Sequence, residues 1–132
     1  MTFLDSSVII DMLRGEPATV AFVEEQDEPY LTSSLCVFEV LHGKLGSGET
    51  DVRGAREDFD GVHSLALTEE IALEAAELQD ALPDDGQRMA TRDLLIAATA
   101  KSTGDKLVVA DSDFETDVLT QHLDVTNLKT NS

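Results

Sequence analysis

The chain has 132 residues, a length typical of one domain with its own core, and its aromatic content of 5% argues against an aromatic-lined platform for sugars or nucleic acids. It contains no run of about 20 apolar residues for a membrane span, no basic N-terminal region for export, and a single cysteine, Cys36, which excludes an internal disulfide. Its 27 acidic residues outnumber the 9 Lys and Arg residues, for a formal charge of −18. We therefore expect one domain, residues 1–132, in a salt-rich, halophilic cytoplasm, where screening weakens the usual objection to a nucleic-acid partner.

Short apolar runs alternate with segments of helical periodicity along the whole chain. We expect strands at residues 2–4, 30–32, 62–67, 107–110 and, at the sheet edge, 123–128. We expect helices at residues 6–13, 17–25, 35–45, 50–60, 69–82 and 91–103, with 83–87 as a loop before the last of them. This alternation predicts an α/β fold with a parallel sheet, in which functional side chains gather at the carboxyl ends of the strands.

Capping residues and apolar spacing predict how two of these helices begin and lie. Ser33 or Ser34 is expected to cap the helix at 35–45, and Thr91 is expected to cap the helix that begins with TRDLLIAATA. On the helix at 35–45, one stripe of side chains is expected to face the core: Leu35, Phe38, Leu41, His42 and Leu45.

Two acids directly follow apolar strands, and two more lie on helices. Asp5 follows the first expected strand and Asp111 the fourth, so both emerge at the same rim of a parallel sheet. Asp93 lies in the first turn of a helix, where capping and the helix dipole alone account for an acid. Glu39 lies among apolar residues in LCVFEVLHG, where a salt bridge to a nearby base alone accounts for it. The candidate bases are Arg14, Lys44 and Arg92.

These four acids can act as one set only if something neutralises them. Two carboxylates about 4 Å apart repel by about 4 kcal/mol at an effective dielectric constant of about 20. Four of them converge only where protons or divalent cations hold them. Because all the donors are hard oxygens, Mg²⁺ or Mn²⁺ fits them best. Such an ion polarises a phosphoryl oxygen and lowers the pKa of a bound water, so this set predicts hydrolysis of a phosphodiester.

Four segments, in chain order, carry these acids: DSSVIIDML, FEVLHG, RDLLIAATA and VVADSDF. Together they resemble the motifs of PIN-domain ribonucleases, in particular the VapC toxins of VapBC toxin–antitoxin pairs. The resemblance implies a PIN-like parallel sheet flanked by helices on both sides and an endoribonuclease that uses Mg²⁺ or Mn²⁺. It also implies homodimers and inhibition by a cognate antitoxin. The chain departs from the family in its acidic surface with few Lys or Arg residues. This departure affects the surface that the family uses to bind RNA, so the resemblance alone does not locate that surface here.

The resemblance also assigns residues to the site. It implies that four acids bind the metal and are catalytic: Asp5, Glu39, Asp93 and Asp111. Asp113, in the segment ADSDF, is the rival for the fourth of these positions. Ser6 matches the hydroxyl residue that follows the first acid and is expected to contact the metal water or the phosphate. Three basic residues are expected to steady the phosphate oxygens: Arg14, Lys44 and Arg92.

Two other functions stay open. A non-catalytic PIN-like regulatory or binding module would keep the acids as part of its salt-adapted surface. A metal-dependent phosphatase with Asp5 as the phosphorylated nucleophile would need a second acid two residues further on, where the chain has Ser7. Cys36 has no basic partner near it in the sequence and is expected to be an inert core thiol.

Overall fold

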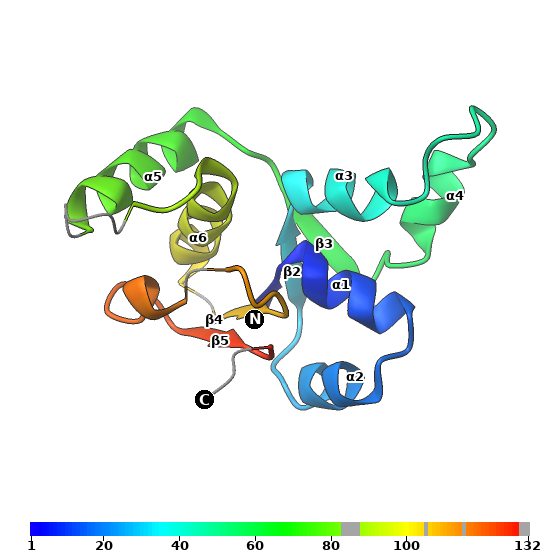
Figure 1. Ribbon diagram of the computed structural model, residues 1–132, viewed down its shortest axis with the longest axis horizontal. Helices are drawn as coiled ribbons and strands as arrows, with labels where there is room; N and C mark the ends of the chain where they lie inside the picture. Colours follow the sequence, from blue (N-terminus) through cyan, green and yellow to red (C-terminus); the bar gives the residue numbers. More distant parts are fainter. Residues whose placement is uncertain (83–87, 105, 115, 130–132) are drawn as a thin grey trace.

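The computed structural model describes residues 1–82, 88–104, 106–114 and 116–129 (Figure 1). Its elements, in chain order, are β1 (Thr2–Leu4), α1 (Ser6–Leu13), α2 (Pro17–Glu24), β2 (Tyr30–Ser33), α3 (Ser34–His42), α4 (Val52–Glu57), β3 (Val62–Leu65), α5 (Glu69–Ala81), α6 (Thr91–Thr103), β4 (Lys106–Val109), a short 3₁₀ helix (Asp117–Leu119) and β5 (Val125–Asn127). The predicted strands and helices are confirmed, with bounds that shift at their ends, and the predicted loop at 83–87 lies outside the described residues. Within those residues, no helix is long and apolar enough to cross a membrane.

The five strands form one parallel sheet, in the order β3-β2-β1-β4-β5. From β1 the chain moves outward through β2 to β3, and then α5 and α6 return it to β4 on the other side of β1. The strand order therefore reverses between β1 and β4. In open α/β sheets, ligands bind outside the carboxyl ends of the strands at such a reversal, so the fold itself marks the place where Asp5 and Asp111 emerge.

Helices cover both faces of the sheet, with α5 and α6 on one side and α1, α2 and α3 on the other (Figure 1). Phe3 and Leu107 belong to the core under α5 and α6. Their neighbours Leu4 and Val108 belong to the core under α1 and α2. This alternation follows from the pleat of the strands, because successive side chains point to opposite faces. The predicted parallel sheet with helices on both sides is confirmed.

The helix α6 is buried along most of its length and carries Asp93 in its first turn. Its buried residues are Leu94, Ile96, Ala97, Ala98, Thr99 and Ala100. The predicted cap at Thr91 is wrong, because the extended residue before the helix is Ala90 and Thr91 is already helical. Gly104 ends the helix with a φ of 72°, a left-handed conformation that glycine adopts without strain.

The helix α3 begins where the sequence predicts, but it turns a different face to the core. The hydroxyl of Ser33 accepts a hydrogen bond from the amide of Leu35 at 3.1 Å and caps the helix. The buried residues are Cys36 and Val40, whereas Phe38 is 55% exposed and stacks on His42, with ring centroids 5.3 Å apart. Leu45, the last member of the predicted stripe, lies beyond the end of the helix and is 44% exposed. The predicted stripe is therefore wrong at Phe38, His42 and Leu45, because contacts with α1 and β2 fix the buried face. Its other two members, Leu35 and Leu41, are partly buried and pack against the core.

Candidate active site

Asp5 lies at the carboxyl end of β1 and is also the N-cap of α1. Its backbone amide donates to the carbonyl of Val108 at 3.0 Å and so joins it to β4. Its Oδ2 accepts a hydrogen bond from the amide of Ser7 at 3.1 Å and another from the hydroxyl of Ser7 at 2.5 Å. Because the side chain is only 1% exposed, these bonds offset the cost of burying a carboxylate.

The hydroxyl of Ser7 holds together the ends of β1 and β4. Besides donating to Asp5, it accepts a hydrogen bond at 2.9 Å from the amide of Ala110, the residue that follows β4. Asp111 comes next along the chain, so one hydroxyl fixes the spacing between the two strand-end acids. The sequence prediction missed this role of Ser7. The sequence feature that pointed to this role was Asp5, because the side chain of an acid at an N-cap bonds to a group two or three residues further along the chain.

Glu39 reaches the same place from α3, which packs against α1. Its Oε1 accepts a hydrogen bond from the hydroxyl of Ser6 at 2.9 Å. Ser6 is the first residue of α1 and is buried. The side chains of Asp5 and Ser6 thus meet Glu39 at the point where the first turn of α1 faces the middle of α3.

The guanidinium group of Arg92, at the start of α6, contacts acids from three elements: β1, α3 and α6 itself. Its Nη2 donates to Asp5 Oδ1 at 2.7 Å, to Glu39 Oε1 at 2.6 Å and to Ser6 Oγ at 2.9 Å. Its Nε donates to Glu39 Oε2 at 2.8 Å, and its Nη1 donates to Asp93 Oδ1 at 2.9 Å. Of the three bases proposed from the sequence as partners of Glu39, Arg92 is therefore the one in contact with it.

Burial and the arginine together decide how readily these acids ionise. Burial alone would raise the pKa of Glu39, but the hydrogen bonds and charge of Arg92, with the Ser6 hydroxyl, outweigh it, and the pKa is lowered. Burial raises the pKa of Asp93, and the charges of Asp5 and Asp111 add to this, so that Arg92 offsets only part of the effect. The carboxylates repel one another, and one cation beside them does not cancel that repulsion completely.

Asp111 and Asp113 differ in their relation to this cluster. Asp111 follows Ala110, just beyond the end of β4, is half-buried, and lies close enough to raise the pKa of Asp93. Its carbonyl accepts a hydrogen bond from Asn127 Nδ2 at 2.8 Å, and its Oδ1 accepts one from the amide of Asp113 at 2.9 Å. The side chain of Asp113 is exposed. The geometry therefore favours Asp111 over Asp113 as the fourth acid.

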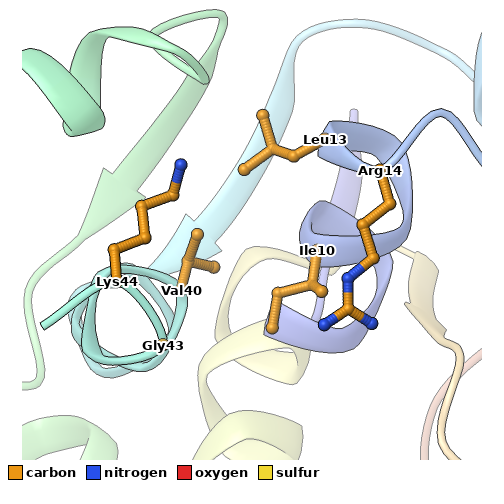
Figure 2. Close-up of a pocket in the computed structure, with 6 residues that line it drawn as sticks. All are labelled: Ile10, Leu13, Arg14, Val40, Gly43 and Lys44. Atoms are coloured by element: carbon orange, nitrogen blue, oxygen red, sulfur yellow. The ribbon is translucent and has the colours of Figure 1, made fainter.

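Arg14 and Lys44 lie away from the carboxylates, on the walls of a neighbouring pocket of about 270 Å³ between α1 and α3. Figure 2 shows Arg14 running beside α1 next to Ile10, while Lys44 extends from the chain just beyond α3. The ammonium group of Lys44 pairs with Asp58 at 3.8 Å, and both side chains are well exposed. The structure brings Ser6 and Arg92 to the acids, whereas Arg14 and Lys44 line a pocket to which none of these acids contributes.

The donor atoms of the cluster suit a hard divalent cation. Ligand atoms of Asp5, Cys36 and Glu39 all lie within 4.8 Å of one another. Burial, with the nearby charge of Asp5, raises the pKa of the Cys36 thiol to about 12, so this sulfur stays protonated and makes a poor ligand. The remaining donors are carboxylate and hydroxyl oxygens, which are the ligands that Mg²⁺ and Mn²⁺ prefer.

Comparisons with known proteins identify the family of this chain. The model of the PIN domain family matches residues 2–116. The chain is 30% identical over 119 residues to Ribonuclease VapC19 of Mycobacterium tuberculosis, covering 88% of this chain and 87% of that one. Among solved structures, FitAcB from Neisseria gonorrhoeae is similar with a TM-score of 0.75 and 25% identity, covering 96% of this chain and 97% of that one. A toxin–antitoxin complex from Klebsiella pneumoniae has the same TM-score of 0.75 and the same coverage of 96% and 97%, at 16% identity. The chain belongs to the PIN-domain family, among the VapC ribonucleases.

Proposed function

We propose that this protein is a Mg²⁺- or Mn²⁺-dependent endoribonuclease that serves as the toxin of a toxin–antitoxin pair. The observation that carries the proposal is the meeting of Asp5, Glu39 and Asp93, from three separate elements, around one cationic group at the carboxyl edge of the sheet. The family and the ribonuclease relative support the cleavage of RNA. Carboxylates that converge in this way suit a reaction at a phosphodiester, whose charge a metal ion must neutralise.

In this proposal, Asp5, Glu39 and Asp93 hold the ion and Asp111 completes the set, with Asp113 as the alternative fourth acid. An ion bound there would supply Lewis-acid chemistry: it would polarise the scissile phosphoryl group and lower the pKa of a water molecule. The chain orients its own ligands, because Ser7 and the start of α1 fix the carboxylate of Asp5. The RNA phosphates contact a hydroxyl and three bases: Ser6, Arg14, Lys44 and Arg92.

The proposed partners are an RNA substrate, a cognate antitoxin protein and a second copy of the chain in a homodimer. The toxin–antitoxin complex among the similar structures supports the antitoxin. Exposed apolar side chains on the two helices that carry Ser6 and Glu39, Leu13 on α1 and Phe38 on α3, support a protein partner on this part of the surface. With an RNA substrate, we expect the protein to act in the cytoplasm, and its charge of −18 supports a halophilic one.

One observation favours a non-catalytic binding module as the second candidate. Arg92 gives hydrogen bonds to Asp5, Glu39 and Asp93, so the acids are paired by the chain itself. A module without catalysis would keep this arrangement as a structural salt bridge. The two candidates differ in whether the acids bind a divalent ion.

The test compares Glu39→Gln with Glu57→Gln, which makes the same chemical change on the exposed side of α4. In concentrated KCl with Mn²⁺, we expect the wild type and Glu57→Gln to cleave RNA and to bind Mn²⁺ saturably. Glu39→Gln should lose both properties, and EDTA should stop cleavage by the wild type. Cleavage that persists in EDTA would contradict the metal role. A wild type that neither cleaves RNA nor binds Mn²⁺ would favour the non-catalytic module.

A further inference from the structure

One nitrogen of Arg92 lies at the meeting point of the acids. Nη2 is 2.7 Å from Asp5 Oδ1, 2.6 Å from Glu39 Oε1 and 2.9 Å from Ser6 Oγ. These three partners come from the end of β1, from α3 and from α1. A guanidinium group that donates to two carboxylates through one nitrogen lies at the centre of the cluster rather than at its rim.

The rest of the guanidinium group fixes this position. Nε bonds to the second oxygen of Glu39 at 2.8 Å, so that this carboxylate is held at both oxygens. Nη1 bonds to Asp93 at 2.9 Å, on the same first turn of α6. The side chain of Arg92 is 28% exposed, and charge-assisted bonds of this geometry are stronger where water is partly excluded.

We infer that Arg92 is a built-in counter-cation of the site, and that it competes with the divalent ion for Asp5 Oδ1 and Glu39 Oε1. This inference rests on the proposed function. An ion held by Asp5 and Glu39 would need the carboxylate oxygens that Nη2 contacts, and two cations cannot lie within about 3 Å of one another without strong repulsion. The guanidinium group must therefore move away from both oxygens when the ion binds.

This competition predicts two effects of opposite sign when Arg92 is removed. The affinity for the divalent ion should rise, because no hydrogen bonds to Arg92 have to break first. The stability of the metal-free protein should fall, because the repulsion among Asp5, Glu39 and Asp93 is no longer offset. A purely structural arginine would give only the loss of stability, and an arginine that helps to hold the ion's ligands in place would lower the affinity.

The experiment measures Mn²⁺ binding by titration calorimetry and melting temperature in EDTA, both in concentrated KCl. Arg92→Gln is compared with Arg53→Gln, which removes the same charge from an exposed position on α4. We expect Arg92→Gln to bind Mn²⁺ about tenfold or more tightly than the wild type, since a hydrogen bond between charged groups is worth at least that factor. Arg53→Gln should stay within about twofold of the wild type. The melting temperature of Arg92→Gln should fall in EDTA and recover when Mn²⁺ is added.

A second variant keeps the inference testable if Arg92→Gln does not fold without metal. Arg92→Lys keeps the charge but cannot donate to Asp5, Asp93 and both oxygens of Glu39 at once, so its Mn²⁺ affinity should lie between those of the wild type and Arg92→Gln. If the wild type binds Mn²⁺ and neither variant binds it more tightly, Arg92 does not compete and the inference is wrong, while the nuclease proposal stands. If no variant binds Mn²⁺, the proposed metal site fails and the inference fails with it.

Discussion

Replacing Ser7 with alanine removes a single oxygen that bonds both to Asp5 and to the residue just before Asp111. That hydroxyl donates to the buried Oδ2 of Asp5 at 2.5 Å and accepts from the amide of Ala110 at 2.9 Å. Ala110 is 8% exposed, so its amide gains little access to water when the hydroxyl is lost. A hydrogen bond to a charged group is worth about 1.5–3 kcal/mol and an unpaired buried amide costs about 1–3 kcal/mol, so Ser7→Ala should lower the free energy of unfolding by about 3 kcal/mol.

The neighbouring serine provides the matched control. Ser6 bonds to Glu39 at 2.9 Å and to Arg92 at 2.9 Å, but these two groups also bond to each other at 2.8 and 2.6 Å. Because neither partner is left unpaired, Ser6→Ala should cost only about 1 kcal/mol. The difference of about 2 kcal/mol between two adjacent serines therefore measures the hydroxyl that joins β1 to β4.

Urea unfolding in concentrated KCl and EDTA measures these differences without any contribution from a bound metal. For a chain of this size, a loss of about 3 kcal/mol lowers the melting temperature by roughly 10 °C. If Ser7→Ala is no less stable than Ser6→Ala, the hydroxyl of Ser7 does not hold the two strand ends together. The positions of Asp5 and Asp111 would then have to come from the sheet alone.

Four further outcomes test other parts of the site. Asp93→Asn should fold with nearly unchanged stability, because burial already raises the pKa of Asp93 and an amide oxygen still accepts a hydrogen bond from Arg92. The same variant should lose RNA cleavage; unfolding and cleavage assays check the two outcomes. Asp111→Asn should reduce cleavage and Mn²⁺ affinity more than Asp113→Asn, and the reverse order would make Asp113 the fourth acid. The lowered pKa of Glu39 adds stability above the pKa of the unfolded carboxyl, and this contribution is lost as the pH falls through the folded pKa. The free energy of unfolding of Glu39→Gln, measured with urea, should therefore fall less steeply on acidification than that of the wild type. The melting temperature of the metal-free protein should rise from dilute to molar KCl, where the screening length falls to about 3 Å.

The elements could be predicted from the sequence because their signals are local. The helix after Asp5 begins with a cap and ends before Gly15 and Pro17, and β4 is an apolar run covered on both faces. The buried face of α3 could not be predicted in the same way. Its sequence has apolar side chains all around, so Phe38 and His42 fit an inward stripe as well as Cys36 and Val40 do. Contacts with α1 and β2, which no local pattern contains, decide between them.

The four acids could be proposed from the sequence, but their cation could not be chosen. Glu39 had three candidate partners, and Lys44 is much nearer to it along the chain than Arg92 is. The structure selects Arg92 because the start of α6 lies opposite α3 at the reversal of the strand order. Arg92 also precedes Asp93 directly, so the residue that brings an acid to the site brings a base with it. Only the packing of α6 against the sheet reveals that this base turns toward the acids.

Salt should act differently on the protein's surface and on its site. In molar salt the screening length is about 3 Å, so charges spread over the surface, with a net value of −18, largely cease to repel RNA or one another. The contacts of Arg92 with Asp5, Glu39 and Asp93 are only 2.6–2.9 Å long and partly buried, and ions in solution cannot enter between such groups. High salt therefore removes the obstacle to an anionic substrate but leaves the competition between Arg92 and the divalent ion in place. A dependence of RNA cleavage on KCl would then report on the surface, and a dependence on Mn²⁺ would report on the site.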